Sequence, residues 1–210
     1  MKAQIKKLSF MQRSEEFIEI SRDIETYLYN SGTYYFLDVL DTQNKLSVEE
    51  LEYLESDIFL LENELKYISF FKKLFQKYNG NVYIYSDLFA RINEKDVEYG
   101  INVLDTIDKK NKLYFLAHIL NLSSYDNDNP THVIRPNSIE NLEMFVSIGY
   151  RNNAFIHAIF VLQPKIIFVP NCTYGFGMIM HEKEYKNIVE LANESKLFVK
   201  KITENPKVNP

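Results

Sequence analysis

The stretch SVEELEYLESDIFLLENELKYISFFKKLFQKY, residues 47–78, carries the strongest fold signal in the chain. It opens on Ser47-Val48-Glu49-Glu50, which has the pattern of a helix capping box. It ends before Asn79-Gly80, a pair typical of a left-handed helix stop. Between these signals, apolar residues alternate at spacings of three and four: Leu51, Leu54, Ile58, Leu61, Leu65 and Ile68. The spacing predicts one long helix with a single apolar stripe.

Two interpretations of this stripe follow from its heptad-like spacing. The first is a core seam against an earlier helix, which begins at Ser14 and carries Phe17, Ile20, Ile24 and Tyr27 on one side. The two helices would then form a long-helix hairpin. The second is a coiled coil with a partner protein or a second copy of the chain, so a homodimer stays open.

Acidic residues crowd the start of the same helix. Those we single out as candidate partner-binding residues are Glu49, Glu52, Glu55 and Asp57. Carboxylates near a helix amino terminus stabilise the helix dipole, so a structural role is sufficient to explain them. They would also suit a partner protein with a basic surface.

The pattern changes after Gly80. Short apolar runs predict strands at Val82–Tyr85, His132–Arg135, Phe176–Met180 and Leu197–Ile202, and a hairpin of Phe155–Leu162 with Lys165–Val169 around Gln163-Pro164. Amphipathic helices are expected at Ser138–Ile148, capped by Ser138 and ended by Gly149, and at Glu182–Asn193. Periodicity does not decide between helix and strand for Leu113–Leu122.

These elements predict an α+β protein with three regions. Residues 1–80 would form the helical hairpin region, and residues 81–122 a helical or winged-helix-like region. Residues 131–204 would form a mostly antiparallel sheet with two helices. The polar sequence SSYDNDNP, residues 123–130, is the clearest boundary between them.

The segment 65–135 contains VYIYSDLFARINEKDVEYGINVLDTIDKKNKLYF, residues 82–115, and resembles a winged helix-turn-helix. The resemblance implies that the helix starting near Asn93 meets nucleic acid with its first residues. That end carries Glu94, Asp96 and Glu98 against Lys95, and acidic side chains repel phosphate. Nucleic acid is therefore not the partner we expect, although a regulator or nucleic-acid accessory protein stays an alternative.

No motif in the chain predicts a cofactor or a metal ion. The histidines are scattered, without the spacing of a zinc site. If the protein is an enzyme, its catalytic residues would be Cys172 with His157 or His181, as in a small hydrolase or transferase. A thiol in an apolar strand end needs no such role, and we expect Cys172 to be structural.

Composition sets the remaining limits. The chain has 210 residues, a net charge of −5 and one cysteine. The single cysteine, the absence of a signal-peptide pattern and the lack of a long apolar run predict a cytoplasmic protein that does not enter membranes. Abundant Tyr, Phe, Ile, Lys and Asn suggest an AT-rich bacterial or phage genome. We expect a non-enzymatic protein-binding module, such as an immunity protein or an inhibitor of a host factor.

Overall fold

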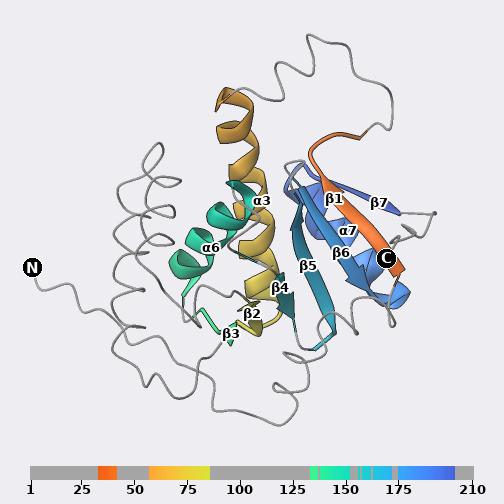
Figure 1. Ribbon diagram of the computed structural model, residues 1–210. Coiled ribbons are helices and arrows are strands. Elements are labelled where there is room, and N and C mark those ends of the chain that lie inside the picture. Colours follow the sequence, from red (N-terminus) through yellow and green to blue (C-terminus); the bar gives the residue numbers. More distant parts are fainter. Residues whose placement is uncertain are drawn as a thin grey trace, which may run out of the picture.

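The computed structural model describes residues 33–41, 57–85, 133–136, 138–151, 156, 158–161, 163–171 and 175–201 (Figure 1). The strands are β1 (Thr33–Asp38), β2 (Val82–Tyr85), β3 (Val133–Ile134), β4 (Ala158–Val161), β5 (Ile166–Asn171), β6 (Gly175–Met180) and β7 (Phe198–Lys201). The helices are α3 (Asp57–Lys77), α6 (Ile139–Arg151), α7 (Tyr185–Glu194) and a 3₁₀ turn at Glu182–Glu184.

The described strands form a seven-stranded sheet in the order β3-β2-β4-β5-β6-β1-β7. Every neighbouring pair is antiparallel. The expected hairpin is present, since β4 pairs with β5 through Ile159 opposite Phe168 and Val161 opposite Ile166. With helices alongside this sheet, the α+β class is confirmed.

The sheet is not confined to the C-terminal part of the chain, and this corrects the expectation. β1 lies between β6 and β7, with Tyr35 opposite Met178 on one side and Lys201 on the other. β2 pairs with β3 and with β4. A strand with neighbours on both sides satisfies all its backbone hydrogen-bonding groups, which a strand in a helical region could not do. β1, α3 and β2 therefore belong to the same structure as the described residues of the region 131–204.

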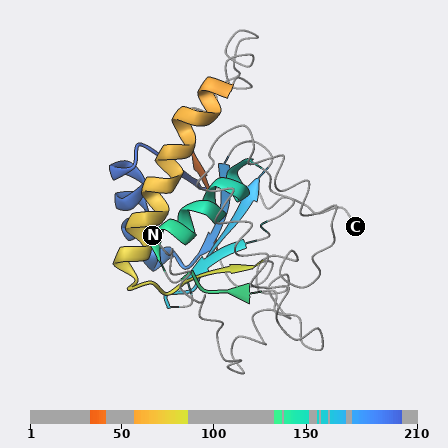
Figure 2. The same cartoon turned by 90° about the vertical axis from the view of Figure 1, so that its left-hand side faces the viewer.

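Three of the described helices cover one face of the sheet. Figure 2 shows α3 between α7 and α6, and α3 contacts both neighbours. The centre of this layer is aromatic: the Phe71 ring lies 5.1 Å from both the Phe168 and Phe176 rings, edge to face. Such rings bury large apolar areas and add a favourable edge-to-face geometry. This aromatic contact fixes which side of α3 faces the sheet.

The opposite face of the sheet is also buried and apolar. It contains Tyr83, Ala158, Phe160, Ile167 and Ile179. A sheet that is apolar on both faces loses the alternation of apolar and polar residues. That is why the strands β4 and β5 read as continuous apolar runs in the sequence.

The local helix signals were mostly correct. α3 ends as expected, because Asn79 and Gly80 have φ of 52° and 72°, and Gly80 N–H donates to the carbonyl of Phe75 at 2.8 Å. Ser138 caps α6, since its Oγ accepts from Asn141 N–H at 3.3 Å. Gly149, however, does not end α6. It lies inside the helix, where a Cβ would come within 3.2 Å of Pro170, so close packing explains the glycine.

The long-helix hairpin stays a prediction. The helix expected from Ser14 to Tyr27 and the first ten residues of the helix expected from Ser47 lie outside the described residues. The described part of α3 packs on α6 and α7 instead. The predicted regions 81–122 and 123–130 are not tested as units, because residues 86–132 are not described.

Candidate functional site

The apolar stripe of α3 lies partly in solvent. Leu61 is 44% exposed and Leu65 is 67% exposed, although both were expected in a core seam. Ile68, the next member of the stripe, packs partly against the core. The stripe therefore leaves the core between Ile68 and Leu65, and the core-seam interpretation is wrong for its two exposed leucines.

A second stripe of α3 forms the core face instead. Its buried members are Phe59, Asn63, Glu64, Tyr67, Phe70, Phe71 and Leu74. The aromatic members bury more area than leucines do, which favours turning this side to the sheet. The sequence pattern did not predict this stripe, because the polar residues Asn63 and Glu64 interrupt its apolar spacing. The aromatic residues in the run Tyr67-Ile68-Ser69-Phe70-Phe71 were the feature of the sequence that could have indicated this buried side.

Glu64 is buried because it has a partner on α6. Arg151 Nε donates to Glu64 Oε2 at 2.8 Å, and a second guanidinium nitrogen lies 2.5 Å from the same oxygen. The two side chains are only 8% and 6% exposed. Asn63 is satisfied separately, since its side-chain amide donates to the carbonyl of Phe59 at 2.8 Å. These contacts are structural: they let two polar residues of α3 enter the core.

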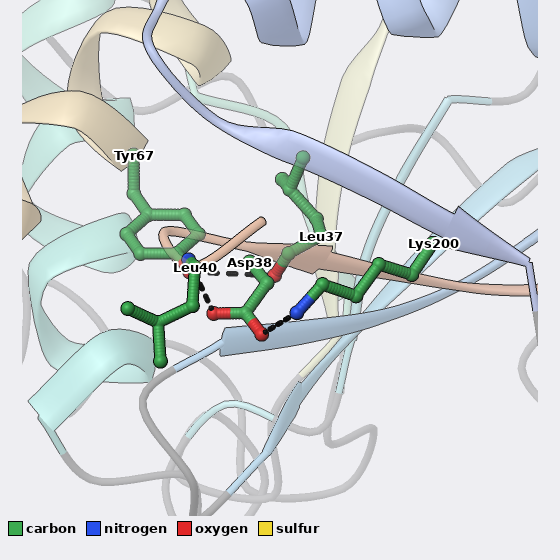
Figure 3. Close-up of polar contacts among 5 residues, drawn as sticks. All are labelled: Leu37, Asp38, Leu40, Tyr67 and Lys200. Atoms are coloured by element: carbon green, nitrogen blue, oxygen red, sulfur yellow. Dashed lines mark hydrogen bonds and ion pairs between the residues drawn. The ribbon is translucent and has the colours of Figure 1, made fainter. Parts of the chain in front are cut away.

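A further polar cluster ties the end of β1 to β7 and α3 (Figure 3). Asp38 accepts from Leu40 N–H at 3.1 Å and binds Lys200 Nζ at 2.7 Å. The Tyr67 hydroxyl donates to the carbonyl of Leu37 at 3.3 Å. Burial, followed by the charge of Asp38 and by Tyr150, raises the pKa of Tyr67 well above its usual value. A phenol held protonated in this way is a weak base and nucleophile, so the cluster has the character of a structural tie.

A nucleic-acid-binding face would need clustered lysines, and the described lysines that could form one have partners within the fold. The residues available for such a face are Lys72, Lys73, Lys77, Lys109, Lys110 and Lys112. Within the described helices, Lys72 pairs with Glu143 of α6 and Lys73 with Glu194 of α7, the latter at 3.2 Å. Lys77 donates to Asn187 of α7 at 3.3 Å. These contacts join α3 to its neighbours, and residues 109–112 lie outside the described part.

Of the alternative catalytic residues, His181 alone belongs to the described part of the chain. His181 is exposed and follows β6, whose six residues start at Gly175. A strand of that length spans about 20 Å. His181 therefore lies far from Asn171, the last residue of β5, which pairs with the first residue of β6. His157 and Cys172 themselves lie outside the described residues.

The predicted acidic partner-binding residues fall at the edge of the described structure. Asp57 is the first residue of α3. Glu49, Glu52 and Glu55 lie outside the described residues. Glu62, which the sequence reasoning did not single out, is exposed one residue after Leu61. Together the exposed leucines and Glu62 define the candidate site, which we call the α3 outer face: Leu61, Glu62 and Leu65.

Two other kinds of site are missing from the described residues. No three of their His, Cys, Asp or Glu side chains gather in a way that could hold a metal ion. Among the described helices, none combines the length and the apolar character needed to cross a membrane.

Comparisons of the chain with protein-family models, with curated proteins and with solved structures found no match. Within the winged-helix-like stretch 65–135, the described segments are the second part of α3, β2 and β3; β2 and β3 are neighbours, but β2 also pairs with β4 of the large sheet. The other two helices expected in that resemblance fall on residues 86–132, outside the described part of the chain.

Proposed function

We propose that this chain is a non-enzymatic protein-binding module and that the α3 outer face is its contact surface. The observation that carries the proposal is the exposure of Leu61 and Leu65. Residues four apart lie on one side of a helix, so the two leucines form one apolar surface. Isolated exposed leucines are common, but adjacent ones on a helix that also has a full core face point to an interaction.

The position of the leucines supports the same proposal. In Figures 1 and 2 the Asp57 end of α3 reaches past the strands and past α6 and α7. Phe59 and Asn63 are buried at this end, so a partner would reach α3 from the side that carries Leu61 and Leu65. The buried half of the same helix, from Tyr67 to Leu74, holds it in place. A surface held rigidly loses little conformational entropy on binding.

The finer description of the function follows the composition of the chain. We propose a cytoplasmic protein of a bacterium or phage, of the kind represented by immunity proteins and inhibitors of host factors. The single cysteine and the acidic net charge support this description. The acidic start of α3 favours a partner with a basic surface.

The test is capture of a partner from a lysate of the organism that encodes the chain. Wild type is compared with Leu61→Ser/Leu65→Ser, and the matched control is Lys186→Ser/Glu190→Ser, two exposed residues of α7 at the same spacing. We expect one protein, identified by mass spectrometry, to bind wild type and control but not the leucine variant. Binding must then be reproduced with the purified partner. A partner set that is unchanged by the leucine variant contradicts the proposal.

A further inference from the structure

We infer that, until a partner binds, the α3 outer face is covered by the α3 outer face of a second copy of this chain, with the two helices antiparallel. The inference rests on the proposed function, because it takes this face as a contact surface and adds how the face is covered before it is used. The observations that carry it are the exposure of the two leucines, the opposite charges beside them and the position of the helix end.

The leucines supply the apolar part of this contact. Leu65 is 67% exposed and Leu61 is 44% exposed, and residues four apart lie on one side of a helix. An antiparallel pair has a two-fold axis perpendicular to both helices. With that axis level with Glu64, Leu65 lies one residue from it, about 1.5 Å along the helix, and Leu61 lies three residues from it. The four leucines then interleave, with the most exposed pair at the centre, and shield one another from water.

The charges beside the leucines complement one another in the same arrangement. Glu62 is exposed and Lys66 is partly exposed, four residues apart on one side of α3. They lie two residues on either side of the height of Glu64. An antiparallel two-fold pair therefore brings Glu62 of each copy level with Lys66 of the other, on the same side of the contact. A carboxylate accepts several hydrogen bonds, so Glu62 can keep its other interaction and still bind this lysine.

The position of the helix end favours antiparallel over parallel pairing. The Asp57 end of α3 reaches past the strands and past α6 and α7 (Figure 2). In an antiparallel pair the sheets of the two copies lie at opposite ends of the contact, so they do not compete for the same space. A parallel pair would place the sheets side by side. It would also turn the side with Glu62 and Lys66 toward the opposite side of the second helix, where Glu64 is already paired with Arg151.

The extent of the contact sets its strength. In the described part of α3, the contact consists of two leucines and one charged pair from each copy, which is less than a standard protein–protein interface. Contacts at the low end of the size range are weak and transient. A weak pair suits a covering role, because a partner with a larger contact displaces the second copy. Dimers should therefore accumulate only as the concentration of the chain rises.

The first experiment is sedimentation of the purified full chain over a range of concentrations. We expect a monomer–dimer equilibrium whose dissociation constant rises at least about tenfold in Leu61→Ser/Leu65→Ser, as truncation of central apolar anchors does. Lys186→Ser/Glu190→Ser, on exposed positions of α7 at the same spacing, should leave the equilibrium unchanged. Circular dichroism confirms that both variants are folded.

Charge reversal tests the antiparallel arrangement separately. Glu62→Lys and Lys66→Glu each place like charges across the contact, so each variant alone should dimerise severalfold more weakly than wild type. An equimolar mixture of the two variants restores both opposite-charge pairs and should recover dimerisation. Lys186→Glu and Glu190→Lys make the same changes of charge on α7. These controls should dimerise like wild type, whether alone or mixed.

Three results would overturn the inference. The first is a chain that stays monomeric throughout the concentration range. The second is a dimer that survives the leucine substitutions. The third is a mixture of the two α3 charge variants that dimerises no better than either variant alone. If one of these results is found while a host partner depends on Leu61 and Leu65, the proposed function stands and only the inferred second copy fails. If the dimer behaves as expected but no host partner depends on the leucines, the face serves the second copy alone and the proposed function fails.

Discussion

The two halves of α3 differ in their surroundings although both are rich in apolar residues. From Tyr67 to Leu74 the helix is covered by the sheet, α6 and α7, and its aromatic rings lie in the core. Toward Asp57 it extends past these elements; Phe59 and Asn63 are still buried there, but Leu61 and Leu65 on the other side face solvent. The difference shows that the apolar character of a helix does not say which side is covered. The side of α3 on which a residue lies therefore decides between core and surface, since Phe59 is buried although it lies farther out than Leu61 and Leu65.

The largest effect should come from the covered half. Phe71→Ala removes the ring that contacts Phe168 and Phe176, and the closely packed layer cannot collapse around it. We expect a loss of about 3–5 kcal/mol in the free energy of unfolding, measured by denaturant titration. A loss below ~1 kcal/mol would mean that the aromatic layer is not the stabilising core, and the comparison between the two halves would fail.

The next effect should come from the ion pair between α3 and α6. Arg151→Met leaves the Glu64 carboxylate buried without its partner, which should cost about 3 kcal/mol. The double variant Glu64→Leu/Arg151→Met removes both charges and should recover most of that loss, because an apolar pair of similar size needs no compensation. Equal stability of the single and double variants would show that the pair is open to water, so that Glu64 belongs to the outer surface.

The pH dependence of stability should also reflect the covered half. Burial, with a smaller contribution from Glu184, raises the pKa of Tyr78 to about 12, and the pKa of Tyr67 is raised as well. Below pH ~10 both phenols are protonated in the folded and unfolded chains, so they have no effect there. As pH rises from about 10 toward 12 the unfolded chain loses these protons first, and the free energy of unfolding should fall.

The check on this pH effect is a pair of conservative variants. Tyr67→Phe and Tyr78→Phe should each flatten the decline measured by chemical denaturation between pH 9 and pH 12. Tyr185→Phe is a suitable control, because Tyr185 is exposed at the edge of α7 and stacks on Tyr35 without being enclosed. A decline of the same slope in all three variants would assign the pH effect to other groups.

The smallest effect should come from the outer face. Leu65→Asp should change the free energy of unfolding by no more than about 0.5 kcal/mol, as expected for an exposed position. Leu61→Asp, at a less exposed position, should cost about 1 kcal/mol. The sequence by itself predicts that Leu61→Asp destabilises the protein severely. Thermal melts of these variants therefore distinguish a buried stripe, expected from the sequence, from the exposed stripe in the structure. A loss above ~3 kcal/mol in the free energy of unfolding at either leucine would show that the stripe is buried in the core.

The local features of the fold could be read from the sequence because neighbouring residues produce them. The stop at Asn79-Gly80, the Ser138 cap and the hairpin of β4 and β5 each depend on a few adjacent residues. The α+β class followed from such elements taken together. The candidate site was only half predicted: the acidic helix start was noticed, but the exposed leucines beside it were assigned to the core.

What the tertiary structure decided are the relations between distant residues. β1 lies between β6 and β7 because Tyr35 and Leu37 find ladder partners about 140 to 165 positions later, and no local pattern records such partners. The pair of Glu64 and Arg151 joins residues 87 positions apart, and it allows the polar side of α3 to face the core. The sequence by itself determined local features such as the stop at Asn79-Gly80 and the cap at Ser138, since their hydrogen bonds join neighbouring residues. Only packing determined that Leu61 and Leu65 meet solvent, because a helix with two apolar sides is oriented by what lies beneath it.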